Sequence, residues 1–400
     1  MGRAHAVSLL GALVLLLGFT ATVTAGAAQA SQSRPAAGSV WQVEPTPNQD
    51  TTSAGVNQLS AVSCTSSRAC TAVGSHAASV SSPSFTLAER WNGTSWRIQP
   101  TILPKGAQAT GFHGVSCASA SSCTAVGSAF VQATSRSVNL AEAWNGKSWR
   151  VQAIPTPKGS TGAGLNAVSC TSSSACTAVG FYDNSAGTVL PVAARWNGTA
   201  WRLETLPKAA STDLFGVSCS AALACTAVGY FPGSADAQPA AEVWNGTSWR
   251  IQKVPLPSGS PGGILSAVSC TSPNACTATG ANFTATAPTL AERWNGTRWR
   301  IQATPFPANS GTSHQQVELN SVSCTSATAC TATGAYAPGG NSDYFLEAWN
   351  GQRWQLVTAP HPVGFVAGAV NGVSCVPTRC TAAGAWSGGP ISVATLAMAN

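Results

Sequence analysis

The sequence predicts an all-β fold: a seven-bladed β-propeller of four-stranded antiparallel blades. Three observations lead to this expectation. The 14 cysteines form seven pairs that recur at a period of about 51 residues, and each pair is followed by a phrase such as LAERWNGTSWRIQ. One isolated copy of the end of that phrase, WQVEP, stands before the first cysteine pair, and the last repeat lacks its final strand. Repeats of this period are typical of propellers, solenoids and arrays.

The first 30 residues have the three parts of a secretory signal peptide. A basic start at Arg3 is followed by an apolar run from Val7 to Phe19 and by the small-residue site Ala28-Gln29-Ala30. The apolar run is about 13 residues long, too short for the roughly 20 residues of a membrane-spanning helix. We therefore expect a secreted, extracellular protein with a signal peptide over 1–30, a short linker over 31–37, a propeller over 38–400, and no membrane span after signal removal.

The composition excludes two classes of protein. Only 8% of the residues are charged, but 44% are hydrophobic and 14 are Trp, which is enough apolar surface for a folded core rather than a disordered chain. The net charge of +7 is spread along the chain without a basic run. Nucleic-acid binding needs clustered cations that neutralise several adjacent phosphates. We expect a monomer that does not bind nucleic acid.

Four strands can be assigned to each repeat from alternation and turn residues. In the first repeat they are a short small-residue strand ending at Cys64, a second over 70–74, a third over 87–91 and a fourth over 96–99. Asn-Gly stands between the last two strands and supplies the positive φ angles of a tight hairpin turn. The dipeptide occurs at Asn92-Gly93, Asn145-Gly146, Asn197-Gly198, Asn245-Gly246, Asn295-Gly296 and Asn350-Gly351.

The two ends of the chain complement each other. The last repeat ends at Asn400 before any fourth strand, whereas the phrase SVWQVEPTP after the leader reads as an isolated fourth strand, with Trp41 in the place of Trp96. Pairing this strand with the C-terminal unit completes a seventh blade and removes two exposed sheet edges. We predict a ring closed in this way.

Each cysteine pair is expected to form a disulfide across the hairpin between the first and second strands. A bridge over such a short loop stabilises by roughly 2 kcal/mol. Zinc is disfavoured because no His recurs with the pairs, and pairing between blades is the alternative. We expect no metal and no cofactor. The expected disulfides are Cys64-Cys70, Cys117-Cys123, Cys170-Cys176, Cys219-Cys225, Cys270-Cys276, Cys324-Cys330 and Cys375-Cys380.

Two further repeated features are interpreted as structural. The paired Trp residues of the third and fourth strands are expected to pack neighbouring blades together rather than to bind sugar, because nearly every unit has them. A buried Glu on the third strand is expected to have a structural hydrogen-bond partner, such as a Trp indole or a turn amide. This Glu is replaced by Ala194 in one unit and occurs at Glu89, Glu142, Glu242, Glu292 and Glu347.

Variation is confined to one end of the predicted ring, where the second strand connects to the third and each blade to the next. Two positions after the Gly that closes the second strand, the repeats have His76, Ala129, Tyr182, Phe231, Asn282, Tyr336 and Trp386. Exposed aromatic rings on a rigid scaffold suit stacking on sugars or gripping a peptide. The alternative is that these rings cap the packing between blades. The candidate ligand-binding residues are His76, Tyr182, Tyr230, Phe231, Tyr336 and Trp386.

Carboxylates at this same end leave an enzyme as an alternative. Glycoside hydrolysis needs two of them about 5 to 10 Å apart, and the sequence nominates no pair. The favoured function is an extracellular binding module for carbohydrate or protein. A glycan-active hydrolase or lyase and a structural surface protein are the alternatives. The carboxylates are Asp50, Asp183, Asp213, Asp236, Glu318 and Asp343.

The phrases SC-x5-C-T-A-x-G and W-N-G-x-x-W-R-I-Q resemble those of secreted propeller-repeat proteins of high-GC Gram-positive bacteria over residues 38–400. At the level of fold the chain is similar to kelch, galactose-oxidase and sialidase-type propellers. It departs from each of them in the functional motif. The phrase WNGTSW lacks the Asp of a sialidase Asp box, and a single Gly74 stands where kelch units have two glycines. The Tyr-Cys and copper chemistry of galactose oxidase has no counterpart, because every Cys belongs to a hairpin pair. The resemblance therefore implies the fold and no particular activity.

Overall fold

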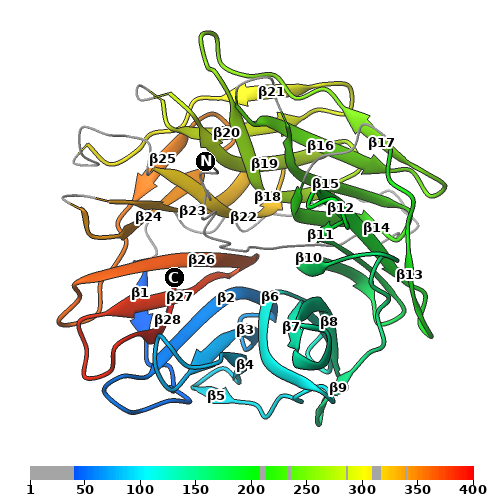
Figure 1. The fold of residues 1–400 in the computed structure, drawn as a ribbon. Coiled ribbons are helices and arrows are strands. Elements are labelled where there is room, and N and C mark those ends of the chain that lie inside the picture. Colours follow the sequence, from blue (N-terminus) through cyan, green and yellow to red (C-terminus); the bar gives the residue numbers. More distant parts are fainter. Residues whose placement is uncertain (1–39, 208–212, 233–235, 285–286, 309–316, 338–339) are drawn as a thin grey trace, which may run out of the picture.

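The computed structural model describes residues 40–400 apart from 208–212, 233–235, 285–286, 309–316 and 338–339, so the expected signal peptide and linker lie outside the described residues. Seven four-stranded antiparallel sheets are arranged in a ring (Figure 1). The described part also has one short 3-10 helix, η1 (Gln132–Thr134). The predicted seven-bladed propeller is confirmed. None of the described helices is long and apolar enough to span a membrane.

Blades one to six use their strands in chain order from the centre outward, and blade seven has the N-terminal strand as its outermost strand. Blade one consists of β2 (Val56–Ser66), β3 (Ala69–Ala77), β4 (Phe85–Trp91) and β5 (Trp96–Ile98). Blade two consists of β6 (Ala107–Ser119), β7 (Ser122–Val131), β8 (Arg136–Trp144) and β9 (Trp149–Val151). Blade three consists of β10 (Gly162–Ser172), β11 (Ala175–Asp183), β12 (Val189–Trp196) and β13 (Trp201–Leu203).

Blades four to six follow the same order, and blade seven differs in its outermost strand. Blade four consists of β14 (Asp213–Ala221), β15 (Ala224–Phe231), β16 (Gln238–Trp244) and β17 (Trp249–Gln252). Blade five consists of β18 (Gly263–Ser272), β19 (Ala275–Asn282), β20 (Thr289–Trp294) and β21 (Trp299–Gln302). Blade six consists of β22 (Glu318–Ser326), β23 (Ala329–Tyr336), β24 (Asp343–Trp349) and β25 (Trp354–Val357). Blade seven is β26 (Ala367–Val376), β27 (Arg379–Ser387), β28 (Ala394–Ala399) and β1 (Gln42–Glu44).

The first strand of each blade is longer than expected. In blade one, β2 has 11 residues and begins well before the small residues that end at Cys64. Strand β2 pairs with β3 on both sides of a bulge between Leu59 and Ala61. Because a bulge interrupts the alternation of side chains, the sequence pattern shows only the part of the strand after it.

The predicted ring closure is confirmed. Strand β1 pairs antiparallel with β28, with Val43 opposite Met398, and lies beside it in Figure 1. The Trp41 side chain is 4% exposed. Glu44 forms an ion pair with Arg379 of β27 and accepts a hydrogen bond of 3.0 Å from the Trp96 indole of blade one. The N-terminal strand therefore joins blade seven and also contacts the next blade.

A belt of buried hydrogen bonds runs around the inner strands. The Ser before the first Cys of each blade accepts a hydrogen bond from the backbone N–H of the first Cys in the next blade, and the bond from Cys64 to Ser374 closes the circle. The N-to-O distances are 2.9–3.0 Å in all seven cases. The pairs are Ser63 with Cys117, Ser116 with Cys170, Ser169 with Cys219, Ser218 with Cys270, Ser269 with Cys324, Ser323 with Cys375, and Ser374 with Cys64.

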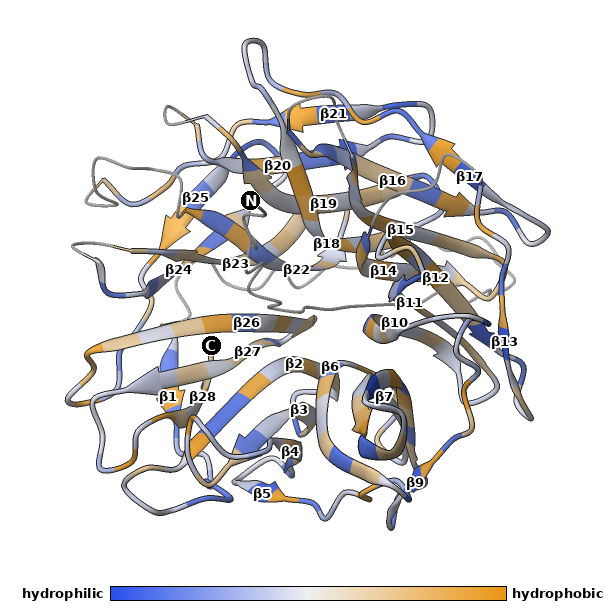
Figure 2. Cartoon of the chain, in the orientation of Figure 1, coloured by the Kyte–Doolittle hydropathy of each residue, from blue (hydrophilic) through white to orange (hydrophobic). Residues whose placement is uncertain are grey.

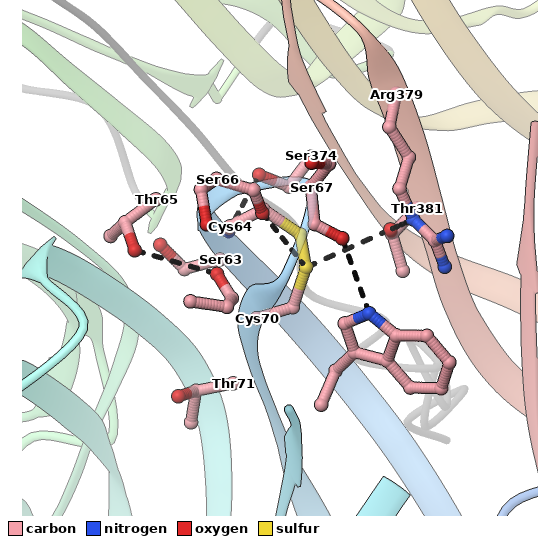
Figure 3. The surroundings of a disulfide bond; sticks show 12 residues. Ser63, Cys64, Thr65, Ser66, Ser67, Cys70, Thr71, Ser374, Arg379 and Thr381 are labelled. Atoms are coloured by element: carbon pink, nitrogen blue, oxygen red, sulfur yellow. Dashed lines mark hydrogen bonds between the residues drawn. A yellow bond between two sulfur atoms is a disulfide. The ribbon is translucent and has the colours of Figure 1, made fainter. Parts of the chain in front are cut away.

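All seven cysteine pairs form the expected disulfides within their hairpins. The sulfur atoms also face the neighbouring blade. In Figure 3 the Cys64–Cys70 bridge lies against blade seven, with Cys70 Sγ 3.7 Å from the Thr381 hydroxyl. The hydroxyl of the corresponding Thr lies near a sulfur of the next blade around the whole ring. Seven disulfides are typical of extracellular proteins.

The paired Trp residues pack blades together, as expected. Six Trp–Trp pairs have ring centroids 5.8–5.9 Å apart. The core consists of seven apolar clusters, one at each interface between blades, and in Figure 2 apolar segments accordingly recur around the ring. The stability of each blade therefore depends on its neighbours.

The partner expected for the repeated Glu, a Trp indole or a turn amide, is present in some blades and absent in others. Four of the fourth-strand indoles donate instead to the Gln of the preceding blade, for example Trp149 to Gln99 at 3.1 Å. Glu142 accepts a 3.2 Å bond from the backbone N–H of Ile102, but neither carboxyl oxygen of Glu292 or Glu347 has a partner among the described residues. Burial raises the pKa of Glu292 to about 8 and that of Glu347 to about 9, so both are protonated at neutral pH.

The Asn-Gly turns differ in one respect from the expectation. Gly93 takes the positive φ, at 99°, whereas Asn92 does not. The Asn92 side chain accepts hydrogen bonds from the backbone N–H groups of Thr94 and Ser95, at 2.9 and 3.0 Å. Asn therefore stabilises the turn through its side-chain oxygen, while Gly supplies the backbone conformation.

Candidate functional site

The two ends of the ring carry different connections. The cysteine hairpins and the Asn-Gly turns lie side by side at one end, as shown by the 3.2 Å hydrogen bond from the Trp91 indole to the Ser67 carbonyl. We call this the turn end. The connections between second and third strands and those between blades lie at the other, which we call the loop end. The candidate binding residues lie at the loop end.

A cavity of about 390 Å³ opens at the loop end of blade seven. Trp386 of β27 forms one wall and is partly exposed. Leu396 of β28, Val43 of β1 and Pro362 of the incoming connection add apolar surface. The volume lies within the range of about 300 to 1,000 Å³ that small-molecule sites occupy.

One side of this cavity is polar and held in place. The Asn48 side-chain oxygen accepts a 2.9 Å hydrogen bond from the Thr395 backbone N–H, and the Thr46 hydroxyl donates to the Thr395 carbonyl at 3.0 Å. This arrangement leaves the Asn48 amide N–H groups without a partner among the described residues. Thr51, which also lines the cavity, is exposed. The site therefore combines an aromatic wall with positioned hydrogen-bonding groups.

A second cavity, of about 330 Å³, lies at the loop end of blade three. Its walls include Tyr182 of β11, Val192 of β12, Leu203 at the end of β13 and Pro157 of the incoming connection. Tyr182 lies opposite Leu190 in the sheet, as Trp386 lies opposite Ala394 in blade seven. The two cavities therefore occupy equivalent positions in their blades.

The other candidate residues are in different surroundings. Tyr336 is 9% exposed, contrary to the expectation of an exposed ring, and donates a 2.9 Å hydrogen bond to Asp343. Its ring packs edge-on against Phe345. His76 Nδ1 lies 2.5 Å from an Asp50 carboxyl oxygen. These two side chains already have partners within the fold.

Tyr230 and Phe231 are neighbours on β15 and therefore face opposite sides of the sheet. The Tyr230 ring stacks on Phe215, with centroids 5.7 Å apart. Phe231 is partly exposed and lies opposite Gln238. The structure thus distributes the six candidates around the ring, and it places Trp386 and Tyr182 in cavities.

Three of the six loop-end carboxylates, Asp50, Asp213 and Asp343, are bonded within the fold. Asp343 accepts a hydrogen bond from Tyr336 and lies 2.8 Å from His361. Burial, with a smaller contribution from the charge of Asp183, raises the pKa of Asp213 to about 8. Asp213 also accepts a 2.9 Å hydrogen bond from the Asn166 amide. Among the described residues, no three His, Cys, Asp or Glu side chains are placed to hold a metal ion.

The sequence reasoning missed the residues that the connections between blades contribute. Asn48 and Thr51 follow the fourth strand of blade seven, and Pro157 and Pro362 precede blades three and seven. A signal for the prolines was present, since each stands eight residues after the Trp of the preceding fourth strand. The polar residues had none, because the connections have no common pattern.

Comparison with solved structures shows the propeller fold. The structure of YCF48 bound to a D1 peptide is similar, with 12% identity, a TM-score of 0.53, and coverage of 93% of this chain and 98% of that one. A polysaccharide lyase, ulvan lyase bound to a fragment of GlcA and Rha3S, has 9% identity, a TM-score of 0.50, and coverage of 85% and 90%. A fucose-specific lectin from Aleuria aurantia, at 10% identity, a TM-score of 0.43 and coverage of 76% and 97%, is too different to carry an argument.

No protein-family model matches the sequence, and no curated protein shows significant similarity to it. At identities this low the solved structures establish the fold and not the activity.

Proposed function

We propose that the protein is a secreted propeller that binds an extracellular carbohydrate or protein at its loop end. The observation that carries this proposal is the blade-seven cavity, where the one Trp outside the repeat pattern, Trp386, lies beside the hydrogen-bonded Asn48. An aromatic wall with a few positioned polar groups is the usual composition of a ligand site. The leader sequence over 1–30 and the seven disulfides support an extracellular location.

The similar structures are compatible with either kind of ligand. YCF48 is bound to a peptide, and ulvan lyase to a polysaccharide fragment. Both span nearly the same fold as this chain, and they show that a propeller of this size accommodates both ligand classes. The choice between the classes therefore depends on the cavities of this chain.

A hydrolase or lyase is the second candidate, and Asp213 favours it. Its pKa of about 8 keeps a proton on this carboxyl at neutral pH, while the charge of Asp183 is close enough to contribute to the shift. A protonated and an ionised carboxyl near each other are the groups that glycoside cleavage uses. The bonds of Asp213 to Asn166 and to the Leu214 backbone also give it a structural role.

The test is a binding and cleavage screen on the mature protein with a glycan array and a peptide array. We expect saturable binding that Trp386→Ala weakens at least about tenfold, equivalent to 1.4 kcal/mol. Leu223→Ala, which removes an exposed side chain at the turn end, is the matched control. Turnover that Asp213→Asn abolishes would favour the enzyme, and no binding to either array would contradict the proposal.

A further inference from the structure

The cavities of blades three and seven share a second property. On the face of the third strand that lines each cavity, the Glu present in the other five blades is missing, with Ala194 in blade three and Met398 in blade seven. Tyr182 lies directly opposite Leu190, and Leu190 and Ala194 are four residues apart on the same strand. Because side chains alternate along a strand, Ala194 and Tyr182 lie on the same face of the blade. Both cavities thus lie in blades whose third strand lacks this Glu, and each lining includes one acid from the outer part of its blade, Glu44 or Glu204.

Charged groups near the blade-seven cavity are bonded elsewhere. The Glu44 carboxylate is paired with Arg379 and accepts the Trp96 indole N–H. The remaining described lining is Trp, Pro, Val, Ile, Ala, Leu, Thr and Asn. A charged ligand group would lose its hydration here without gaining an ion pair, which is unfavourable. The blade-three cavity has one acid in its lining, Glu204, which interacts with the charge of Arg195 and can accept hydrogen bonds from hydroxyl groups. Both cavities therefore disfavour an anionic ligand and favour a neutral one.

A neutral hexopyranose matches the shape and chemistry of this cavity. One face of such a ring consists of C–H groups, which pack on an aromatic ring such as Trp386. Its hydroxyl groups accept and donate hydrogen bonds, and the Asn48 amide and Thr51 hydroxyl offer both at the cavity edge. An extended peptide also has apolar side chains, but its backbone needs a row of N–H and C=O partners. Each lining includes only one or two residues of the outer edge strand, Val43 and Glu44 or Leu203, which are too few to form such a row.

We propose that the blade-seven and blade-three cavities are two equivalent sites, each binding one neutral hexopyranose ring of a glycan. This inference rests on the function proposed above and makes it more specific. The cavities are three blades apart in one direction and four in the other, so they open on nearly opposite sides of the ring. One molecule then bridges two glycan chains.

The experiment is isothermal titration calorimetry of the mature protein with neutral hexose oligosaccharides of the mannan, glucan and galactan types. We expect about two sites per chain for the oligosaccharide that binds. Trp386→Ala and Tyr182→Ala should each reduce the number to about one, and the double variant should abolish binding. Leu223→Ala at the turn end should keep two sites. Thermal unfolding of each variant checks that it is folded.

The outcomes separate this inference from the proposed function. One site, or a loss of binding that Trp386→Ala causes and Tyr182→Ala does not, would overturn the two-site proposal. Binding of acidic glycans or peptides without neutral sugars would overturn the ligand class and leave the binding function in place. Binding of nothing on either array would overturn both. Cross-linking of polysaccharide-coated beads by the wild type, but not by either single variant, would support bridging.

Discussion

The contacts between the inner strands and the turns at the turn end repeat from blade to blade, whereas the residues of the loop end differ from one blade to another. The Ser-to-Cys hydrogen bond is present at all seven interfaces, and so is the hairpin disulfide. At the loop end the corresponding side chains range from Ala129 to Trp386. Residues that recur in every unit therefore make the interfaces between blades, and residues that depart from the repeat are the ones free to serve recognition.

The same comparison holds between blades with similar residues. Tyr336 in blade six and Tyr182 in blade three occupy equivalent positions, but Tyr336 is buried against Phe345 and bonded to Asp343. Tyr182 is partly exposed in a cavity. An aromatic residue at this position is thus buried where neighbouring side chains pack on it and bond to it, and it is accessible to a ligand where they do not.

The largest expected effect concerns the repeated Glu. Burial raises the pKa of Glu347 from 4.5 to about 9, so the folded protein holds this proton more tightly than the unfolded chain. Its contribution to stability is complete below pH 4.5 and is lost as the pH rises through 9, by about 1.4 kcal/mol per pH unit. Denaturant unfolding from pH 5 to 9 should show this fall. Glu347→Gln should reduce the slope, and a slope equal to that of the wild type would contradict the assignment.

Ring closure is the next largest effect. Trp41→Ala removes a buried side chain that joins the first strand to blade seven, and the loss should be about 3–5 kcal/mol. Val40→Ala, at a neighbouring position that is 76% exposed, should change little. Urea unfolding measures both. An unchanged midpoint for Trp41→Ala would mean that β1 does not hold the ring closed.

The fold followed from the sequence because its determinants are repeated and local. Seven cysteine pairs, the Asn-Gly turns and the missing fourth strand of the last repeat define the blades and their closure. The partners of the repeated Glu did not follow, because Gln residues of the preceding blade accept the Trp indoles instead. The partners of His76 and Tyr336 did not follow either. Asp50 lies 26 residues before His76, and Asp343 opposes Tyr336 across a connection that has no repeated pattern.

A hairpin disulfide should matter for stability and not for binding. Replacing both Cys64 and Cys70 by Ser opens one short loop and should cost roughly 2 kcal/mol. Unfolding under non-reducing conditions measures this loss. Binding at the loop end should keep its affinity in the same variant, and a tenfold loss of affinity would mean that the two ends are coupled.

The smallest effect concerns the hydrogen bonds that fourth-strand Trp indoles donate to side chains of the preceding blade. Glu204 stands where four other blades have the Gln that accepts the next indole, and the Trp249 indole has no partner among the described residues. Unlike Glu44, which accepts the Trp96 indole, Glu204 interacts with the charge of Arg195. Glu204→Gln should restore this bond and stabilise by about 0.5–1.5 kcal/mol. Thermal unfolding measures the gain. The control is Gln252→Ala, which removes the acceptor of the 2.9 Å bond from Trp299 and should destabilise by a similar amount. A stabilising Gln252→Ala would contradict the role of these bonds.

Hydrogen–deuterium exchange, with and without the tightest-binding neutral oligosaccharide, tests most directly whether the departures from the repeat form the binding sites. We expect new protection in the segments around Asn48, Tyr182 and Trp386, and none at the cysteine hairpins or the Asn-Gly turns. Protection that is confined to the turn end, or that avoids blades three and seven, would contradict the account.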